Sequence, residues 1–120
     1  FSDKIIHGGY SWWGTGVHIE GGDPEDLSAW GTMHISLRSG DDAFDSVKIR
    51  MESKGGNGEV DAADYGFVND GEWHSIEIPL SDLEATGLDL GSITSPIGLG
   101  GKAGEAGETL WVDNLYLTMD

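Results

Sequence analysis

Short runs of alternating apolar and polar residues recur along the chain, with glycine-rich or acidic segments between them. The clearest runs place Met33, Ile35 and Leu37, and then Val47, Ile49 and Met51, at every second position. A period of two is typical of a strand that buries one face. Eight segments have a strand-like pattern, namely 1–6, 16–20, 32–38, 46–51, 65–68, 73–79, 93–99 and 109–117. They predict an all-β fold, a β-sandwich or jelly roll of about eight to ten antiparallel strands.

The segments between these strands carry residues that favour turns. Gly-Gly-Asp-Pro at 21–24, Ser-Gly-Asp-Asp at 39–42, Gly-Gly-Asn-Gly at 55–58 and Asn-Asp-Gly at 69–71 are all of this kind. One helical turn is predicted at 81–84, where Ser81 can cap the start and Glu84 can complete a capping box. A single short helix does not change the predicted class.

Length and charge narrow the function. At 120 residues the chain is expected to form one domain, 1–120, excised from a longer secreted protein. The 22 acidic residues against 6 basic ones give a formal net charge of −16, which repels phosphate backbones and anionic lipids. Nucleic acid and membranes are therefore excluded as expected partners, and the acidic surface favours a monomer. The absence of cysteine excludes disulfides, zinc–thiolate sites and thiol nucleophiles.

The outward positions of two consecutive strands carry basic side chains. His34 and Arg38 alternate with the apolar residues of the first strand, and Lys48 and Arg50 with those of the second. If the two strands are neighbours, these residues form one platform of hydrogen-bond donors suited to sugar hydroxyls. An ordinary solvated face with cross-strand ion pairs would give the same pattern.

The tryptophans fall into several kinds of position. Trp12 and Trp13 are consecutive, so in an extended chain they point to opposite sides and only one can enter the core. The other is a candidate platform for a sugar ring, with packing at the sandwich edge as the alternative. Trp30 and Trp111 lie among apolar neighbours and are expected in the core, and Trp73 is expected to reach the core through a bulge at the start of its strand.

No motif for catalysis or for a transition metal is present. The chain lacks a G-x-S-x-G sequence, a phosphate-binding loop and a dinucleotide fingerprint, and its four histidines show no paired spacing. A pair of carboxylates at glycosidase spacing would arise by chance among 22 acidic residues, so it is not evidence for an enzyme.

Three segments resemble a known family. The sequence DGEWHSIEIPLSDL at 70–83, LDLGSI at 88–93 and LWVDNLY at 110–116 resemble the galactose-binding-like β-jelly-roll carbohydrate-binding modules of bacterial polysaccharide-degrading enzymes. The likeness covers the last half of the chain well and the first third loosely. It implies a jelly roll without catalytic activity, and often a structural calcium ion. The family's calcium ligand in the final strand would fall on Asp113, with Asp3 as its partner and Glu20 as a third candidate.

The resemblance and the residue patterns together predict a non-catalytic module. It would anchor a secreted or cell-surface enzyme, through a covalently linked catalytic domain, to a polysaccharide, namely a β-glucan or another plant or algal polymer. Trp12, Trp13, His34, Arg38, Lys48 and Arg50 are the expected sugar-binding residues. The alternatives are a structural or interaction β-sandwich without a sugar ligand, and a small glycan-cleaving enzyme that uses paired carboxylates.

Overall fold

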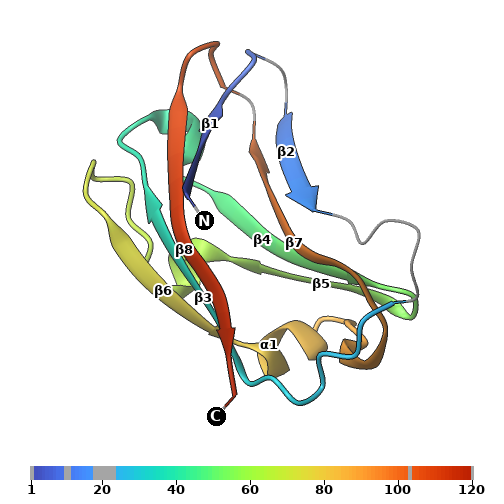
Figure 1. Cartoon of the computed structure of the whole chain (residues 1–120). Coiled ribbons are helices and arrows are strands. Elements are labelled where there is room, and N and C mark those ends of the chain that lie inside the picture. Colours follow the sequence, from blue (N-terminus) through green and yellow to red (C-terminus); the bar gives the residue numbers. More distant parts are fainter. Residues whose placement is uncertain (1, 10–11, 18–23, 103, 120) are drawn as a thin grey trace.

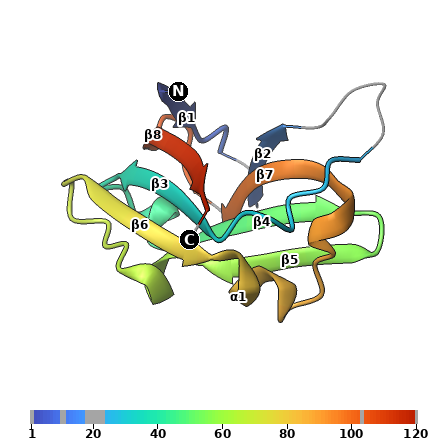
Figure 2. The same ribbon diagram turned by 60° about the horizontal axis from the view of Figure 1, so that its bottom comes forward.

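Two antiparallel sheets face each other in the computed structural model of the chain (Figures 1 and 2). The structure describes residues 2–9, 12–17, 24–102 and 104–119, with the backbone alone for Ser2, Asp3, Trp12, Trp13 and 15–17. Sheet A has the order β1-β8-β3-β6 and sheet B the order β2-β7-β4-β5. The strands are β1 (Ser2–Ile6), β2 (Trp12–Val17), β3 (Thr32–Arg38), β4 (Val47–Ser53), β5 (Gly56–Asp61), β6 (His74–Pro79), β7 (Ile93–Lys102) and β8 (Thr109–Thr118).

The predicted all-β sandwich is therefore confirmed, and so are most of its strands. The second strand begins earlier than expected, at Trp12, and the predicted strand at 65–68 is absent. The 3-10 helix η2 (Ala62–Tyr65) ends at the first residue of that segment. The glycine-rich segment 55–58, expected to be a turn, instead contributes the start of β5. The helical turn is confirmed as α1 (Leu80–Glu84), but the predicted capping was wrong, because Pro79 is in the capping position and its side chain forms no capping hydrogen bond. Two further 3-10 helices are η1 (Asp42–Phe44) and η3 (Leu90–Ser92).

The core fills the space between the two sheets. The alternating residues of β3 and β4 identified above are all buried, as are Ile76 and Ile78 of β6 and Leu110 and Val112 of β8. Each of these strands turns every second side chain inward, because successive side chains on a strand point to opposite faces. Two expectations for the tryptophans were wrong: Trp111 is 43% exposed on β8, and Trp73 is 45% exposed just before β6. Trp30 packs against the core as expected.

No helix in the described part of the chain is long and apolar enough to cross a membrane.

Candidate functional site: the outer face of sheet B

The predicted basic platform is divided between two faces of the molecule. β3 belongs to sheet A and β4 to sheet B, so His34 and Arg38 lie on one outer face and Lys48 and Arg50 on the opposite one. The prediction of a single platform was therefore wrong. The chain crosses from one sheet to the other between Arg38 and Val47, and consecutive strands in a sandwich need not pair.

On the outer face of sheet B, two basic residues stand beside a strip of glycines. Gly100 of β7 pairs with Gly14 of β2 on one side and with Lys48 of β4 on the other. In the next row along the strand, Gly98 of β7 lies between Gly16 and Arg50. Glycine has no side chain, so a ligand can approach the backbone closely along this strip.

Acidic neighbours hold the two basic side chains in place. The ammonium of Lys48 donates to Oδ2 of Asp61 at 3.0 Å, and this hydrogen bond raises the pKa of Lys48. Partial burial alone would raise the pKa of Asp61, but hydrogen bonds from the Ala63 amide and from Lys48 outweigh it and lower that pKa. Both groups therefore remain charged across the neutral range.

Arg50 is similarly anchored while keeping donors for a ligand. Its Nη2 lies 3.2 Å from Oε1 of Glu52 and, with the Asn57 amide oriented to satisfy its neighbours, 2.7 Å from the side-chain oxygen of Asn57. Its Nε is buried without a hydrogen-bond partner in the described part of the protein. A guanidinium has five N–H donors, so anchoring through Nη2 leaves the Nη1 hydrogens for sugar hydroxyls.

The strand β2 brings the two adjacent tryptophans to the end of the glycine strip. Trp12 pairs with Lys102 and Trp13 with Gly101 of β7. Their side chains lie outside the described residues, so which of them faces a ligand stays a prediction.

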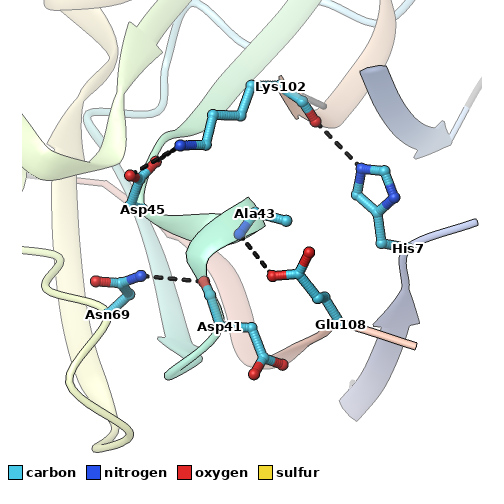
Figure 3. Close-up of polar contacts among 7 residues, drawn as sticks. All are labelled: His7, Asp41, Ala43, Asp45, Asn69, Lys102 and Glu108. Atoms are coloured by element: carbon cyan, nitrogen blue, oxygen red, sulfur yellow. Dashed lines mark hydrogen bonds and ion pairs between the residues drawn. The ribbon is translucent and has the colours of Figure 1, made fainter. Parts of the chain in front are cut away.

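The loops at one edge of the sandwich form a second candidate place for binding (Figure 3). A depression of about 280 Å³ there is lined by Asp42, Ala43, Lys102, Gly104, Glu105 and Glu108.

Internal contacts already engage the polar groups at this edge. Lys102 is paired with Asp45 at 2.8 Å, and Glu108 accepts from the Ala43 amide at 2.9 Å (Figure 3). His7 is 2% exposed, and its Nδ1 accepts from the Gly9 amide, so its Nε2 carries the hydrogen and donates to the Lys102 carbonyl. This edge is therefore built mainly to close the end of the sandwich.

The expected calcium ligands do not form a site within the described residues. No three His, Asp or Glu side chains converge there, and Oδ1 of Asp113 accepts from the Asn114 amide at 2.8 Å. The backbone of Asp3 pairs with Val112, whereas Ser2 is opposite Asp113. The side chain of Asp3 and the whole of Glu20 lie outside the described residues, so calcium stays a prediction.

Sequence reasoning missed the glycine strip. The sequence contained a signal for it, since Gly98 and Gly100 alternate with apolar residues in the sequence of β7. Glycines inside a strand often mark a place that a ligand approaches closely.

The comparisons with solved structures agree with this architecture. A family 30 carbohydrate-binding module matches with a TM-score of 0.78 at 17% identity, over 98% of this chain and 66% of that one. The family 30 module of a cellulosomal cellulase of Clostridium thermocellum matches with a TM-score of 0.74 at 19% identity, over 98% and 73%. A family 11 module of the same organism, in complex with a β-1,3-1,4-mixed-linked tetrasaccharide, gives 0.67 at 20% identity, over 98% and 82%.

No curated protein sequence matches the chain. The family model described as carbohydrate binding domain 30, however, matches residues 2–119, which is nearly the whole sequence. Modules of this family bind carbohydrate and are non-catalytic. This rules out both alternatives from the sequence analysis, a small glycan-cleaving enzyme and a β-sandwich without a sugar ligand. The chain belongs to the carbohydrate binding domain 30 family.

Proposed function

We propose that this module binds a β-glucan chain along the outer face of sheet B. Family membership supports a carbohydrate ligand. The face is chosen because paired glycines of β2 and β7 lie beside Lys48 and Arg50 of β4 on the outer side of sheet B. A polymer needs a long, open contact, and the glycine strip runs across two neighbouring strands. Fixed donors beside the strip would hydrogen-bond to sugar hydroxyls.

The choice of β-glucan rests on relatives. The similar family 11 module was solved with a mixed-linked glucan tetrasaccharide, and a similar family 30 module comes from a cellulase. The acidic character of this chain also disfavours acidic polymers, because its net charge of −16 repels uronate or sulfate groups.

The aromatic contact in this proposal comes from β2. One of the two tryptophans, either Trp12 opposite Lys102 or Trp13 opposite Gly101, stacks on a pyranose ring at the end of the glycine strip. Affinity electrophoresis of Trp12→Ala and Trp13→Ala would identify which one, since the other substitution should lower thermal stability instead.

We further propose that the module works outside the cell as part of a larger enzyme. A covalently attached catalytic domain would gain a higher local concentration of substrate from a bound polymer. The chain spans 66% to 82% of the length of the matched modules cited above. The activity of the parent protein is therefore a proposal as well.

The test is affinity electrophoresis in gels that contain mixed-linkage β-glucan, xylan, mannan, agar or alginate. We expect retardation by mixed-linkage β-glucan and about tenfold weaker binding of the double variant Lys48→Ala, Arg50→Ala. The matched control is Lys4→Ala, Arg38→Ala, which removes the same two charges from the outer face of sheet A. Undiminished retardation of the sheet B variant, or an equal loss in the control, would contradict the proposed face.

A further inference from the structure

A second set of aromatic and polar groups lies on the outer face of sheet A, on the side opposite the proposed polymer site. Tyr116 of β8 is 53% exposed, and its ring stacks on His34 of β3 with centroids 4.5 Å apart and planes at 6°. His34 is itself fixed, since its Nε2 lies 2.8 Å from Oγ1 of Thr118. The Tyr116 ring is thus an exposed aromatic surface held in one orientation.

The backbone beside this ring departs from regular strand geometry. His34 pairs with Tyr116 and Ser36 with Asp113, so two residues of β8 lie opposite Ile35 alone, which is a β-bulge. Within the bulge, Asn114 has φ of 52°, the only positive φ of a non-glycine residue in the described part of the chain. Bulges and residues in such conformations concentrate at functional sites, where they redirect a side chain.

The bulge directs the Asn114 amide toward a pair of serines. Nδ2 of Asn114 lies 3.4 Å from Oγ of Ser36, which lies 3.1 Å from Oγ of Ser75. A bond between two hydroxyls uses one of their two hydrogens, so the other hydrogen remains for a ligand. The Asn114 carbonyl oxygen adds an acceptor to the same place.

These groups surround a depression of about 240 Å³, lined by His34, Ser36, Ser75, Glu77, Asn114 and Tyr116 together with two backbone neighbours. Its volume falls below the roughly 300 Å³ at which clefts for drug-sized ligands begin, so it suits one ring and not a chain. Glu77, whose side chain is 72% exposed, places a carboxylate at the rim. A carboxylate there accepts from sugar hydroxyls and repels an acidic sugar.

We infer that the outer face of sheet A holds a second saccharide site, which takes a single neutral pyranose ring. The apolar face of the sugar stacks on Tyr116, and its hydroxyls contact Glu77, Asn114 and the serine pair. The ligand class rests on the proposed function of the module, but the location does not, because no residue of this site belongs to sheet B.

Two sites on opposite faces of a sandwich cannot contact the same stretch of polymer. A module with both would join two neighbouring polysaccharide chains, or a chain and a side-branch sugar. Affinity at the second site is expected in the millimolar range, because a shallow, exposed contact leaves little free energy beyond that lost in association.

The experiment is an NMR titration that follows the Tyr116 ring and the Asn114 side-chain amide. The probes are methyl β-glucoside, methyl β-galactoside, methyl β-xyloside and cellotetraose, each raised to tens of millimolar. We expect saturable shifts of both groups with at least one probe, and the same shifts in Lys48→Ala, Arg50→Ala. The Lys48→Ala, Arg50→Ala variant separates the two sites. If it loses retardation by the polymer but keeps the shifts of Tyr116 and Asn114, the inference holds.

Three variants complete the design. Tyr116→Ala should raise the Kd at least about tenfold, and Asn114→Gly should raise it less while keeping the backbone, because glycine accepts a positive φ. Trp111→Ala removes another exposed aromatic of β8 away from the depression and should leave the titration unchanged. Absence of shifts with all four probes would overturn the inference. So would unchanged shifts of the Asn114 amide in Tyr116→Ala together with unchanged shifts of the Tyr116 ring in Asn114→Gly.

Discussion

At the scale of single residues, Glu108 shows how a half-buried carboxylate can organise a loop. Its two oxygens accept from the backbone amides of Glu105 at 2.6 Å and Ala43 at 2.9 Å, and so join the loop before β8 to the start of η1. Figure 3 shows the hydrogen bond to Ala43. These two hydrogen bonds, first that of Glu105 and then that of Ala43, lower the pKa of Glu108 below its ordinary 4.5. The charged form is therefore the one that stabilises the fold.

The variant Glu108→Ala should lower the melting temperature by several degrees at neutral pH. Because the folded pKa lies below the unfolded one, this contribution is present above about pH 4.5 and is lost as the pH falls through the folded value. The difference in melting temperature between wild type and variant should therefore close in acid. Thermal melts by circular dichroism between neutral pH and pH ~3 measure it.

Glu105→Ala is the matched control for that series. It removes the same charge, while the Glu105 amide that donates to Glu108 is kept. A difference that is constant with pH, or an equal destabilisation in the control, would show that the carboxylate of Glu108 does not act as described.

At the scale of elements, β5 depends on a helix that packs closely against it. A Cβ atom at Gly58 of β5 would lie 2.7 Å from the carbonyl oxygen of Leu83 in α1 and 2.9 Å from the Cβ of Leu88. These distances are too short for a side chain, and the neighbours include backbone, so the glycine is required by close approach of the helix.

Gly58→Ala should therefore destabilise the protein by about 1 to 3 kcal/mol, the usual range for overpacking. Gly40→Ala is the comparison, because a Cβ there would meet its nearest neighbour at an ordinary 3.5 Å and should change stability by less than about 0.5 kcal/mol. Urea denaturation of the two variants distinguishes them. Equal midpoints for Gly58→Ala and wild type would show that α1 can move away from β5 at little cost.

The same elements show what the sequence could predict. Alternation assigned the inward residues of β3 and β4 correctly, because the period of a strand is set by its backbone. It could not say which sheet each strand joins, so His34 and Lys48 were placed together although they lie on opposite faces. Gly56 and Gly58 favour a turn by composition, but they pair with Ser53 and Met51 of β4 and so form a strand. Gly58 also lies against Leu83 of α1, which the sequence does not reveal.

Exposed aromatics were the harder part of the site to predict. Trp111 and Tyr116 sit on the same strand among apolar residues, and their amphipathic rings suit either the core or the surface. The exposure of Tyr116 depends on the bulge at Asn114, which shifts the alternation of β8 and arises from its pairing with β3. Trp111 lies before the bulge, and alternation with the buried Leu110 and Val112 turns it outward. Pairing across distant strands is not encoded in the local pattern of either strand.

At the scale of the whole molecule, the net charge of −16 acts on every element at once. Self-repulsion on this scale destabilises the compact state, and added salt weakens that repulsion. Any cation therefore stabilises the protein to some degree. A specific calcium site has to be separated from this general effect of ionic strength.

Thermal unfolding at one fixed, high ionic strength tests whether Asp113, Asp3 and Glu20 bind calcium. If the site exists, a calcium chelator should lower the melting temperature by several degrees, and millimolar Ca²⁺ should restore it where the same concentration of Mg²⁺ does not, because the larger ion tolerates irregular carboxylate cages. At 100 times its Kd, calcium would add about 2.7 kcal/mol to the free energy of unfolding. Asp113→Asn should abolish the response to calcium while conserving the shape of the side chain. A melting temperature that is the same with chelator and with Ca²⁺ would contradict the calcium hypothesis. Asp113, Asp3 and Glu20 would then contribute only to solubility.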